Sequence, residues 1–101
     1  FNAVRNYGAI TLIENNNLLT GLDGGIVNSG LIDVVTNTAG GEIIGRNIAG
    51  ILNFNTIPEI NNAGLIQGGA NGYGLENPGI INELNNSGTI TGTAGDAAGR
   101  G

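Results

Sequence analysis

The sequence predicts an all-β protein, a parallel β-helix (β-solenoid) of about four coils, and three regularities support this prediction. A unit of the form apolar-x-Asn-x-Gly-x-apolar recurs along the chain. The units form pairs nine residues apart, and successive pairs begin 22, 25 and 24 residues apart (26−4, 51−26 and 75−51). The apolar positions are mostly Ile and Val, which suit pleated strands, and the frequent glycines exclude a helix. A repeat period of this length is typical of solenoids.

One coil of the solenoid is called a rung below. We expect one solenoid segment over residues 1–101, with rungs over residues 4–25, 26–50, 51–74 and 75–101. Gly101 occupies the place of Gly25, Gly50 and Gly74, each of which is the last residue before a new rung begins, and the first residue is Phe1. We therefore expect the segment to belong to a longer array.

The composition excludes several function classes. The chain has 101 residues, 20 glycines, no cysteine and a net charge of −5, and its only cations are Arg5, Arg46 and Arg100. We expect no nucleic-acid partner, because phosphate backbones are held chiefly by clustered Lys and Arg. The apolar runs are only a few residues long, so we expect no direct insertion into a membrane, which takes about 20 consecutive apolar residues. Without cysteine there is no disulfide or thiolate chemistry.

Superposition of the four rungs places apolar residues in four columns. Ile43 arrives two residues late in its column, because Gly40 and Gly41 lengthen the preceding corner. The columns are Val4, Ile26, Ile51 and Leu75; Ile10, Ile32, Ile57 and Ile81; Ile13, Val35, Ile60 and Leu84; and Leu19, Ile43, Ile66 and Ile90.

Each rung is expected to turn at its Asn-x-Gly corners. The last corner position holds glycine in most units and asparagine in two of them, Asn55 and Asn17. Gly and Asn enter the left-handed region most readily, so the sequence predicts a positive φ there. The glycines of this position are Gly8, Gly30, Gly79, Gly64 and Gly88, and the lengthened corner of one unit holds Ala39, Gly40 and Gly41 instead.

Strands such as residues 9–14 and 31–36 are expected between the corners. The apolar residues Ile10 and Ile13 are three apart, and strict alternation cannot direct both of them inward. The sequence therefore predicts a bulge or bend between them. Pro58 falls at the equivalent place, where a missing N–H group is tolerated.

The asparagines of the corners form columns of their own. Identical amides one rung apart can hydrogen-bond along the solenoid axis, as in cross-β structures, and each bond contributes about 1 kcal/mol. The spacing predicts these structural ladders but leaves open whether the amides face the interior. The residues are Asn6, Asn28, Asn53 and Asn77, and Asn15, Asn37, Asn62 and Asn86.

A third side of each rung varies in length, over residues 21–25, 45–50, 68–74 and 92–101. Length variation in a solenoid maps to loops on one face, which is often the binding face. A partner is expected to bind there first. The candidate binding residues are Asp23, Arg46, Asn71, Tyr73 and Asp96.

Three segments carry a resemblance to a known family. Residues 25–32 read GIVNSGLI, residues 60–68 read INNAGLIQG, and residues 84–92 read LNNSGTITG. These strings resemble the I-x-N-x-G-x-I-x-G repeats of bacterial autotransporter passenger domains and related large surface adhesins. The resemblance implies a right-handed parallel β-helix at the bacterial cell surface, a structural stalk that presents loops to a host or cell-surface glycan or protein.

Chemistry is sparse in this chain. It lacks His, Cys and Lys, so the usual nucleophile and base pairs cannot be built, and we expect neither an enzyme nor a cofactor. Glu59 and Glu83 occupy equivalent positions on adjacent rungs, about 5 Å apart at Cα. Such a pair could hold a hard cation, but two solvated glutamates are the favoured interpretation, and no metal site is expected.

Two alternative functions stay open at this point. A self-assembling extracellular filament subunit is one, because neither end shows a polar capping repeat and open rungs can stack end to end. A carbohydrate-active β-helix enzyme is the other, although it requires a groove with several charged groups. The presence of only 11 acidic and basic residues in the chain, 8 and 3 respectively, argues against the enzyme.

Overall fold

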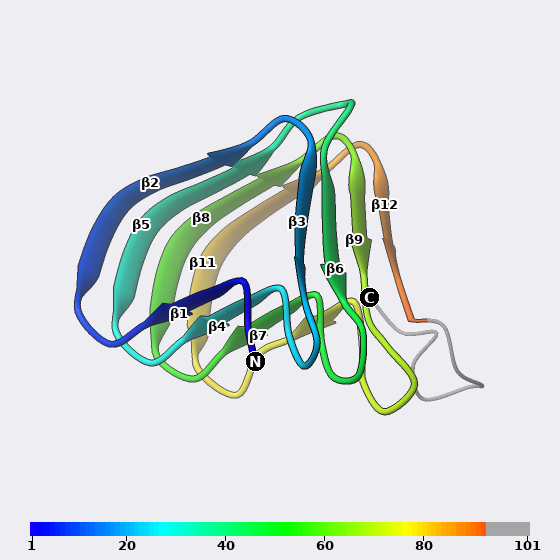
Figure 1. Cartoon of the computed structure of the whole chain (residues 1–101). Helices are drawn as coiled ribbons and strands as arrows, with labels where there is room; N and C mark the ends of the chain where they lie inside the picture. The colour runs from blue at the N-terminus through cyan, green and yellow to red at the C-terminus, as the bar shows by residue number, and fades with distance from the viewer. Residues whose placement is uncertain (93–101) are drawn as a thin grey trace.

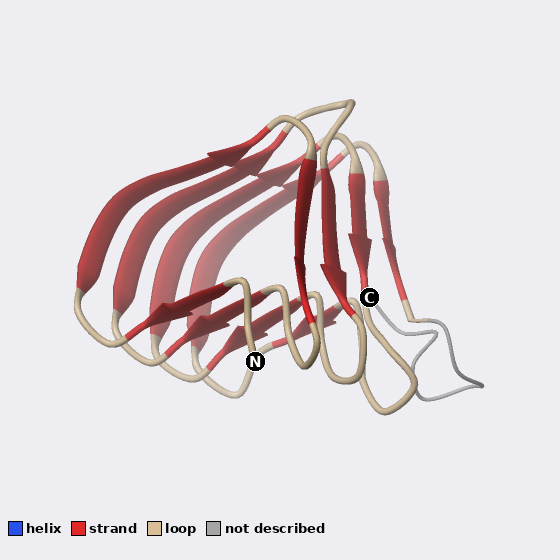
Figure 2. Ribbon diagram, viewed as in Figure 1, coloured by secondary structure: helices blue, strands red, loops and turns tan. Residues whose placement is uncertain are grey.

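The computed structural model describes residues 1–92 and is a β-solenoid of about four rungs (Figure 1). Twelve strands form three parallel sheets of four strands each, and no helix occurs in the described range. Every rung contributes one strand to each sheet, as the three red faces in Figure 2 show. The predicted fold class is confirmed, while the right-handed sense stays a prediction.

The sheets are named by the side of the rung that they form. Sheet 1 holds β1 (Val4–Asn6), β4 (Ile26–Asn28), β7 (Ile51–Asn53) and β10 (Leu75–Glu76). Sheet 2 holds β2 (Ala9–Asn15), β5 (Leu31–Asn37), β8 (Thr56–Asn62) and β11 (Ile80–Asn86). Sheet 3 holds β3 (Leu18–Gly21), β6 (Glu42–Gly45), β9 (Leu65–Gln67) and β12 (Thr89–Thr91).

The register between rungs confirms the predicted apolar columns. Leu19 lies beside Ile43 and Ile43 beside Ile66, so the corner at Gly40 and Gly41 absorbs the two extra residues. The interior of the solenoid is built from these columns. Its fully buried members are Ile26, Ile32, Val35, Ile43, Ile51, Ile57, Ile60 and Ile66, all on the second and third rungs.

The long strands of sheet 2 bend where the sequence predicted a break. Ladder pairing joins Ile10 to Ile32 and resumes at Leu12 and Val34, so the residue between them is unpaired. The bend lets both Ile10 and Ile13 pack against the core. Figure 1 shows the curvature of β2, β5, β8 and β11. The strands end at Asn15 and Asn37, one residue later than expected, because each asparagine still pairs with its neighbour.

Pro58 lies at this bend. The register between β5 and β8 joins Leu31 to Thr56 and then Val34 to Glu59, so position 58 takes no part in that ladder. Proline cannot donate a backbone hydrogen bond and is tolerated where ladder pairing is interrupted. The bend therefore explains why a proline fits inside a seven-residue strand of an inner rung.

The predicted positive φ at the corner glycines is wrong. None of Gly30, Gly64 and Gly79 has φ in the left-handed region. A Cβ on Gly30 would instead overlap the carbonyl oxygen of Gly8 and lie 2.8 Å from the carbonyl carbon of Tyr7 on the preceding rung. Glycine is required because adjacent corners approach closely, and the backbone conformation itself would accept a side chain.

Candidate functional site

The corner asparagines form two continuous ladders through the solenoid. In each ladder, Nδ2 of one asparagine donates to Oδ1 of the next over 2.8–2.9 Å. The first ladder runs from Asn6 through Asn28 and Asn53 to Asn77, and the second from Asn15 through Asn37 and Asn62 to Asn86.

The ladders lie inside the solenoid, which settles the question that the spacing left open. Asn28 and Asn53 are fully buried, and Asn37 and Asn62 are nearly so. A buried amide without partners costs roughly 1–3 kcal/mol, so each one needs its hydrogen bonds made internally. Among the described residues, no buried side-chain nitrogen or oxygen lacks a partner.

Asn28 shows how one amide serves two purposes. Within its own corner, its Nδ2 donates to the Gly30 carbonyl over 2.9 Å and its Oδ1 accepts from the Gly30 N–H group. Toward the next rung, the same Nδ2 donates to Asn53 Oδ1 and to the Thr56 carbonyl over 3.1 Å. The asparagine therefore closes the corner and also ties one rung to the next.

The variable third side is ordered by backbone hydrogen bonds between rungs. Asn47 donates its N–H to the Asp23 carbonyl over 3.2 Å, and Asn71 donates its N–H to the Asn47 carbonyl over 2.8 Å. The side chains continue the pattern, since Asn71 Nδ2 donates to Asn47 Oδ1 over 2.7 Å. These loops thus extend the stacking of the sheets despite their different lengths.

The third side also covers part of sheet 1 from outside. Val27 and Leu52 point away from the main core, yet they are buried in a second cluster with Ala49 and the partly buried Ile48. This cluster was not predicted from the sequence. Two adjacent apolar residues in one column, Val27 beside Leu52, were the available signal.

The predicted binding residues of the third side differ in accessibility. Arg46 and Asn71 are exposed, whereas Asp23 and Tyr73 are partly buried. The Phe1 ammonium group donates to the Asp23 carboxylate and holds the pKa of that carboxyl below its usual range. Asp96 lies outside the described residues. Of the predicted binding residues that the structure describes, Arg46 and Asn71 are therefore the exposed ones, and a role for them in binding stays a prediction.

The glutamate pair is adjacent, as predicted. Glu59 and Glu83 are register partners on β8 and β11, and Glu59 accepts a hydrogen bond of 2.8 Å from Asn61 Nδ2. Within residues 1–92, no group of three or more His, Cys, Asp or Glu side chains could hold a metal ion. The two glutamates thus lie beside a polar amide side chain, as is usual on the outer surface of a protein.

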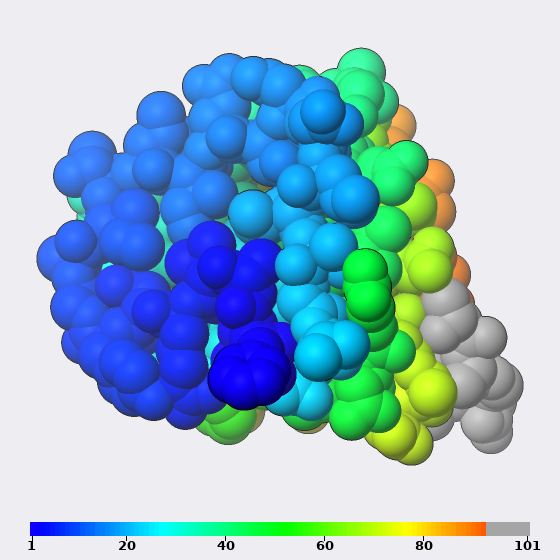
Figure 3. All heavy atoms as spheres, viewed as in Figure 1, coloured from blue at the N-terminus to red at the C-terminus, as the bar shows by residue number. Residues whose placement is uncertain are grey.

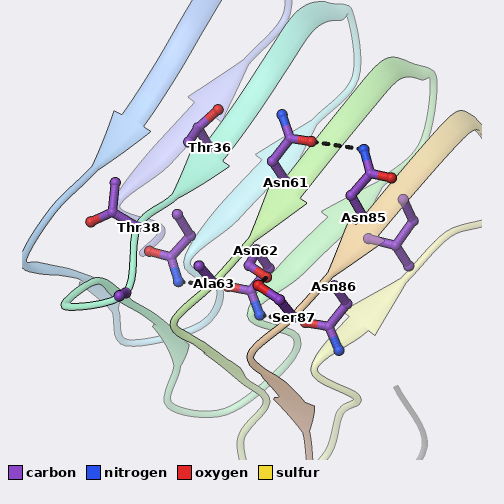
Figure 4. Close-up of a pocket in the computed structure, with 11 residues that line it drawn as sticks. Thr36, Thr38, Asn61, Asn62, Ala63, Asn85, Asn86 and Ser87 are labelled. Atoms are coloured by element: carbon purple, nitrogen blue, oxygen red, sulfur yellow. Dashed lines mark hydrogen bonds between the residues drawn. The ribbon is translucent and has the colours of Figure 1, made fainter.

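An open hollow of about 700 Å³ lies beside the corner that Gly40 and Gly41 lengthen. Figure 4 shows its outward amides, with Asn85 Nδ2 donating to Asn61 Oδ1 over 2.8 Å. Thr36 occupies the same column on the preceding rung. The lining consists of uncharged side chains, so the hollow offers hydrogen-bonding groups but no acid or base.

The fold and the ladders define this protein as a parallel β-solenoid repeat protein. No protein-family model, curated protein or solved structure matches the chain. The part of the chain that the structure describes contains no helix of the length and apolar character needed to cross a membrane.

Proposed function

We propose that this chain is a structural stalk segment of a secreted or surface-displayed bacterial adhesin of the autotransporter type. The observation that carries the proposal is the uninterrupted stacking of equivalent rungs, in which each inner rung buries the same apolar columns and the same two asparagine columns. The resemblance of the repeats to passenger-domain repeats supports the cell-surface setting.

A stalk needs length that adds rung by rung. In a solenoid each repeat contacts chiefly its neighbours, so stability accumulates from nearest-neighbour contacts. Parallel strands lie about 4.8 Å apart, and each further rung therefore lengthens the molecule by about that distance. The loops of the third side fit this function, because their mutual hydrogen bonds and the covered Val27 and Leu52 make them part of the scaffold.

Insertion of complete rungs tests the proposal. Two extra copies of residues 51–74, 24 residues each (74−51+1), placed between Gly74 and Leu75 continue every column in register. We expect the longer chain to fold and its maximum dimension to increase by about 10 Å, as measured by small-angle X-ray scattering.

The control carries the same inserted residues in shuffled order, which keeps composition and length but destroys the columns. Compared with the in-register insertion, this control should show less β-structure per residue in its circular dichroism spectrum, because the shuffled residues either disrupt the solenoid or stay disordered. If the in-register insertion fails to lengthen the molecule, or destabilises it as much as the shuffled one, the chain is not a modular stalk.

A further inference from the structure

Asn71 is the one asparagine of this chain that is followed by a glycine. In an Asn-Gly pair the backbone nitrogen of the glycine can attack the side-chain amide of the asparagine, because glycine has no side chain to hinder the approach. The reaction is intramolecular, so its rate depends on whether the fold leaves the two groups free to meet. The surroundings of Asn71 differ in this respect from those of the ladder asparagines.

The ladder asparagines of the second and third rungs are protected by hydrogen bonds. Their side chains are buried, and each amide donates to the amide of the next rung. The backbone N–H group that follows each of them also donates to the carbonyl of a ladder asparagine on the preceding rung, over 2.8–3.0 Å. The attacking nitrogen and the attacked amide are therefore both engaged in bonds between rungs. The asparagines are Asn28, Asn37, Asn53 and Asn62, and the N–H groups belong to Ser29, Thr38, Phe54 and Ala63.

Asn71 lies in a turn of the third side, in the loop that connects β9 to β10. This loop, yellow-green in Figure 3, reaches the surface of the molecule, and the Asn71 side chain is exposed. The Gly72 N–H group donates to the Gly69 carbonyl within the same loop over 3.3 Å, which is longer than the bonds that protect the ladder asparagines. The Asn71 amide donates to Asn47, and water competes for this bond because both side chains are exposed. Freeing the two reacting groups therefore costs less than opening a buried ladder.

The fold requires glycine at position 72. A Cβ there would overlap the backbone carbonyl group of Ile48 on the preceding rung. A larger residue, which would slow the attack, does not fit. A substitution that blocks the reaction therefore has to be made at Asn71, whose side chain is exposed.

We propose that Asn71 is a site of spontaneous deamidation. The Gly72 nitrogen loses its proton and bonds to Cγ of Asn71, the bond from Cγ to Nδ2 breaks, and Nδ2 leaves as ammonia. One water molecule then opens the resulting succinimide ring at either of its carbonyls. Opening at Cγ gives aspartate, and opening at the backbone carbonyl gives isoaspartate, in which the main chain runs through Cγ. This modification goes beyond the stalk function, because it depends only on the geometry of one loop.

The isoaspartate form changes the fit between two neighbouring loops. The Asn71 N–H group donates to the Asn47 carbonyl over 2.8 Å, and the Tyr73 carbonyl accepts from the Gly50 N–H group over 3.2 Å. These bonds fix the loop on both sides of the reacting peptide bond, and isoaspartate inserts one more backbone carbon between them. The loop must then shift against the loop of the preceding rung. The aspartate form keeps the backbone and adds only a negative charge.

Mass spectrometry of the full 101-residue chain, incubated at mildly alkaline pH, tests the proposal. Fragmentation locates each exchange of a side-chain amide for a carboxylate and distinguishes isoaspartate from aspartate. The incubation is done with the folded chain and with the chain unfolded in urea. We expect the rates of Asn71 in the two states to agree within about ten-fold, and Asn28 to react at least about 100-fold more slowly when folded. Asn28 is the matched comparison because a small residue, Ser29, follows it.

Asn71→Gln is the control variant. Glutamine keeps the amide, but its reaction needs a larger ring that forms far more slowly, so we expect no modification at position 71 during the same incubation. Asn71→Gln and Asn71→Asp should both keep the thermal midpoint of the fresh wild-type chain, because the side chain at this position is exposed. The isoaspartate fraction of the aged wild-type chain should unfold at a lower temperature.

Three results would overturn the proposal. If folding slows Asn71 as strongly as Asn28, the loop protects its reacting groups as well as the ladders do. If aged Asn71→Gln is modified as fast as the aged wild-type chain, the reactive residue lies elsewhere. An isoaspartate fraction as stable as the fresh chain excludes the predicted shift of the loop. The stalk function is unaffected by these outcomes, because the insertion experiment tests it separately.

Discussion

Gly30→Ala is expected to lower the free energy of unfolding by roughly 3 kcal/mol or more, because forcing a group into a filled site moves backbone atoms. The added methyl group would overlap the Gly8 carbonyl oxygen and press on Tyr7, both backbone groups that hold the preceding rung in place. The Gly8 carbonyl also accepts the N–H of Leu31 over 2.8 Å, so a shift would break ladder bonds of sheet 2. Urea denaturation followed by circular dichroism measures the change.

Gly8→Ala is the matched control, since Gly8 holds the same corner position on the first rung. A Cβ there meets nothing within 4 Å, and φ of Gly8 also lies outside the left-handed region. Alanine should therefore leave stability unchanged or raise it by about 0.4–1 kcal/mol through the unfolded state. If both variants lose stability equally, backbone strain rather than close approach explains the corner glycines.

Asn53→Leu is expected to destabilise the solenoid by about 3–5 kcal/mol, and Asn6→Leu by about 1–2 kcal/mol. Asn53 is fully buried and donates to the carbonyls of Asn55 and Ile80 as well as to Asn77 Oδ1. Leucine removes these bonds and also leaves the Asn28 amide without its ladder acceptor.

Asn6 is the matched comparison because it begins the same ladder. It donates to Asn28 but has no amide on its other side among the described residues. Replacing it leaves Asn28 Oδ1 with its bond from the Gly30 N–H group, so fewer groups are orphaned. Urea midpoints of the two variants measure the difference, and equal midpoints would contradict a cooperative ladder.

The apolar columns could be predicted because they depend only on spacing. A parallel register forces residues one period apart into one column, so the position of Ile43 and the bend between Ile10 and Ile13 followed from counting residues. Successive side chains of a strand point to opposite faces, so two residues that are three apart can both face the core only if the strand bends between them. These features are local consequences of the strand geometry.

The role of the corner glycines could not be predicted, because it depends on the distance between rungs. Glycine is compatible with a left-handed corner and also with a close approach of two backbones, and a single sequence does not distinguish them. The inward direction of the amides was open for a similar reason. The amides of Asn28 and Asn53 are seen to lie inside the solenoid only when the packing of each rung against its neighbour is known.

The burial of sheet 1 beneath the third side could not be predicted from the sequence either. The variable length of the third side indicated loops on a surface, yet Val27 and Leu52 lie buried beneath it beside Ala49. Alternation along a strand directs Val27 to the face opposite Ile26, but it does not indicate that a loop from another part of the rung covers that face. Long loops fold back according to tertiary contacts, which repeat spacing does not encode.

Hydrogen exchange of the asparagine side-chain amides, measured by nuclear magnetic resonance, tests the central claim that buried ladders hold the rungs together. We expect the amide protons of Asn28 and Asn53 to exchange at least about 100-fold more slowly than those of the exposed Asn16 and Asn82, because they need an opening of the solenoid to meet water. Similar exchange rates for all four side chains would contradict the ladders.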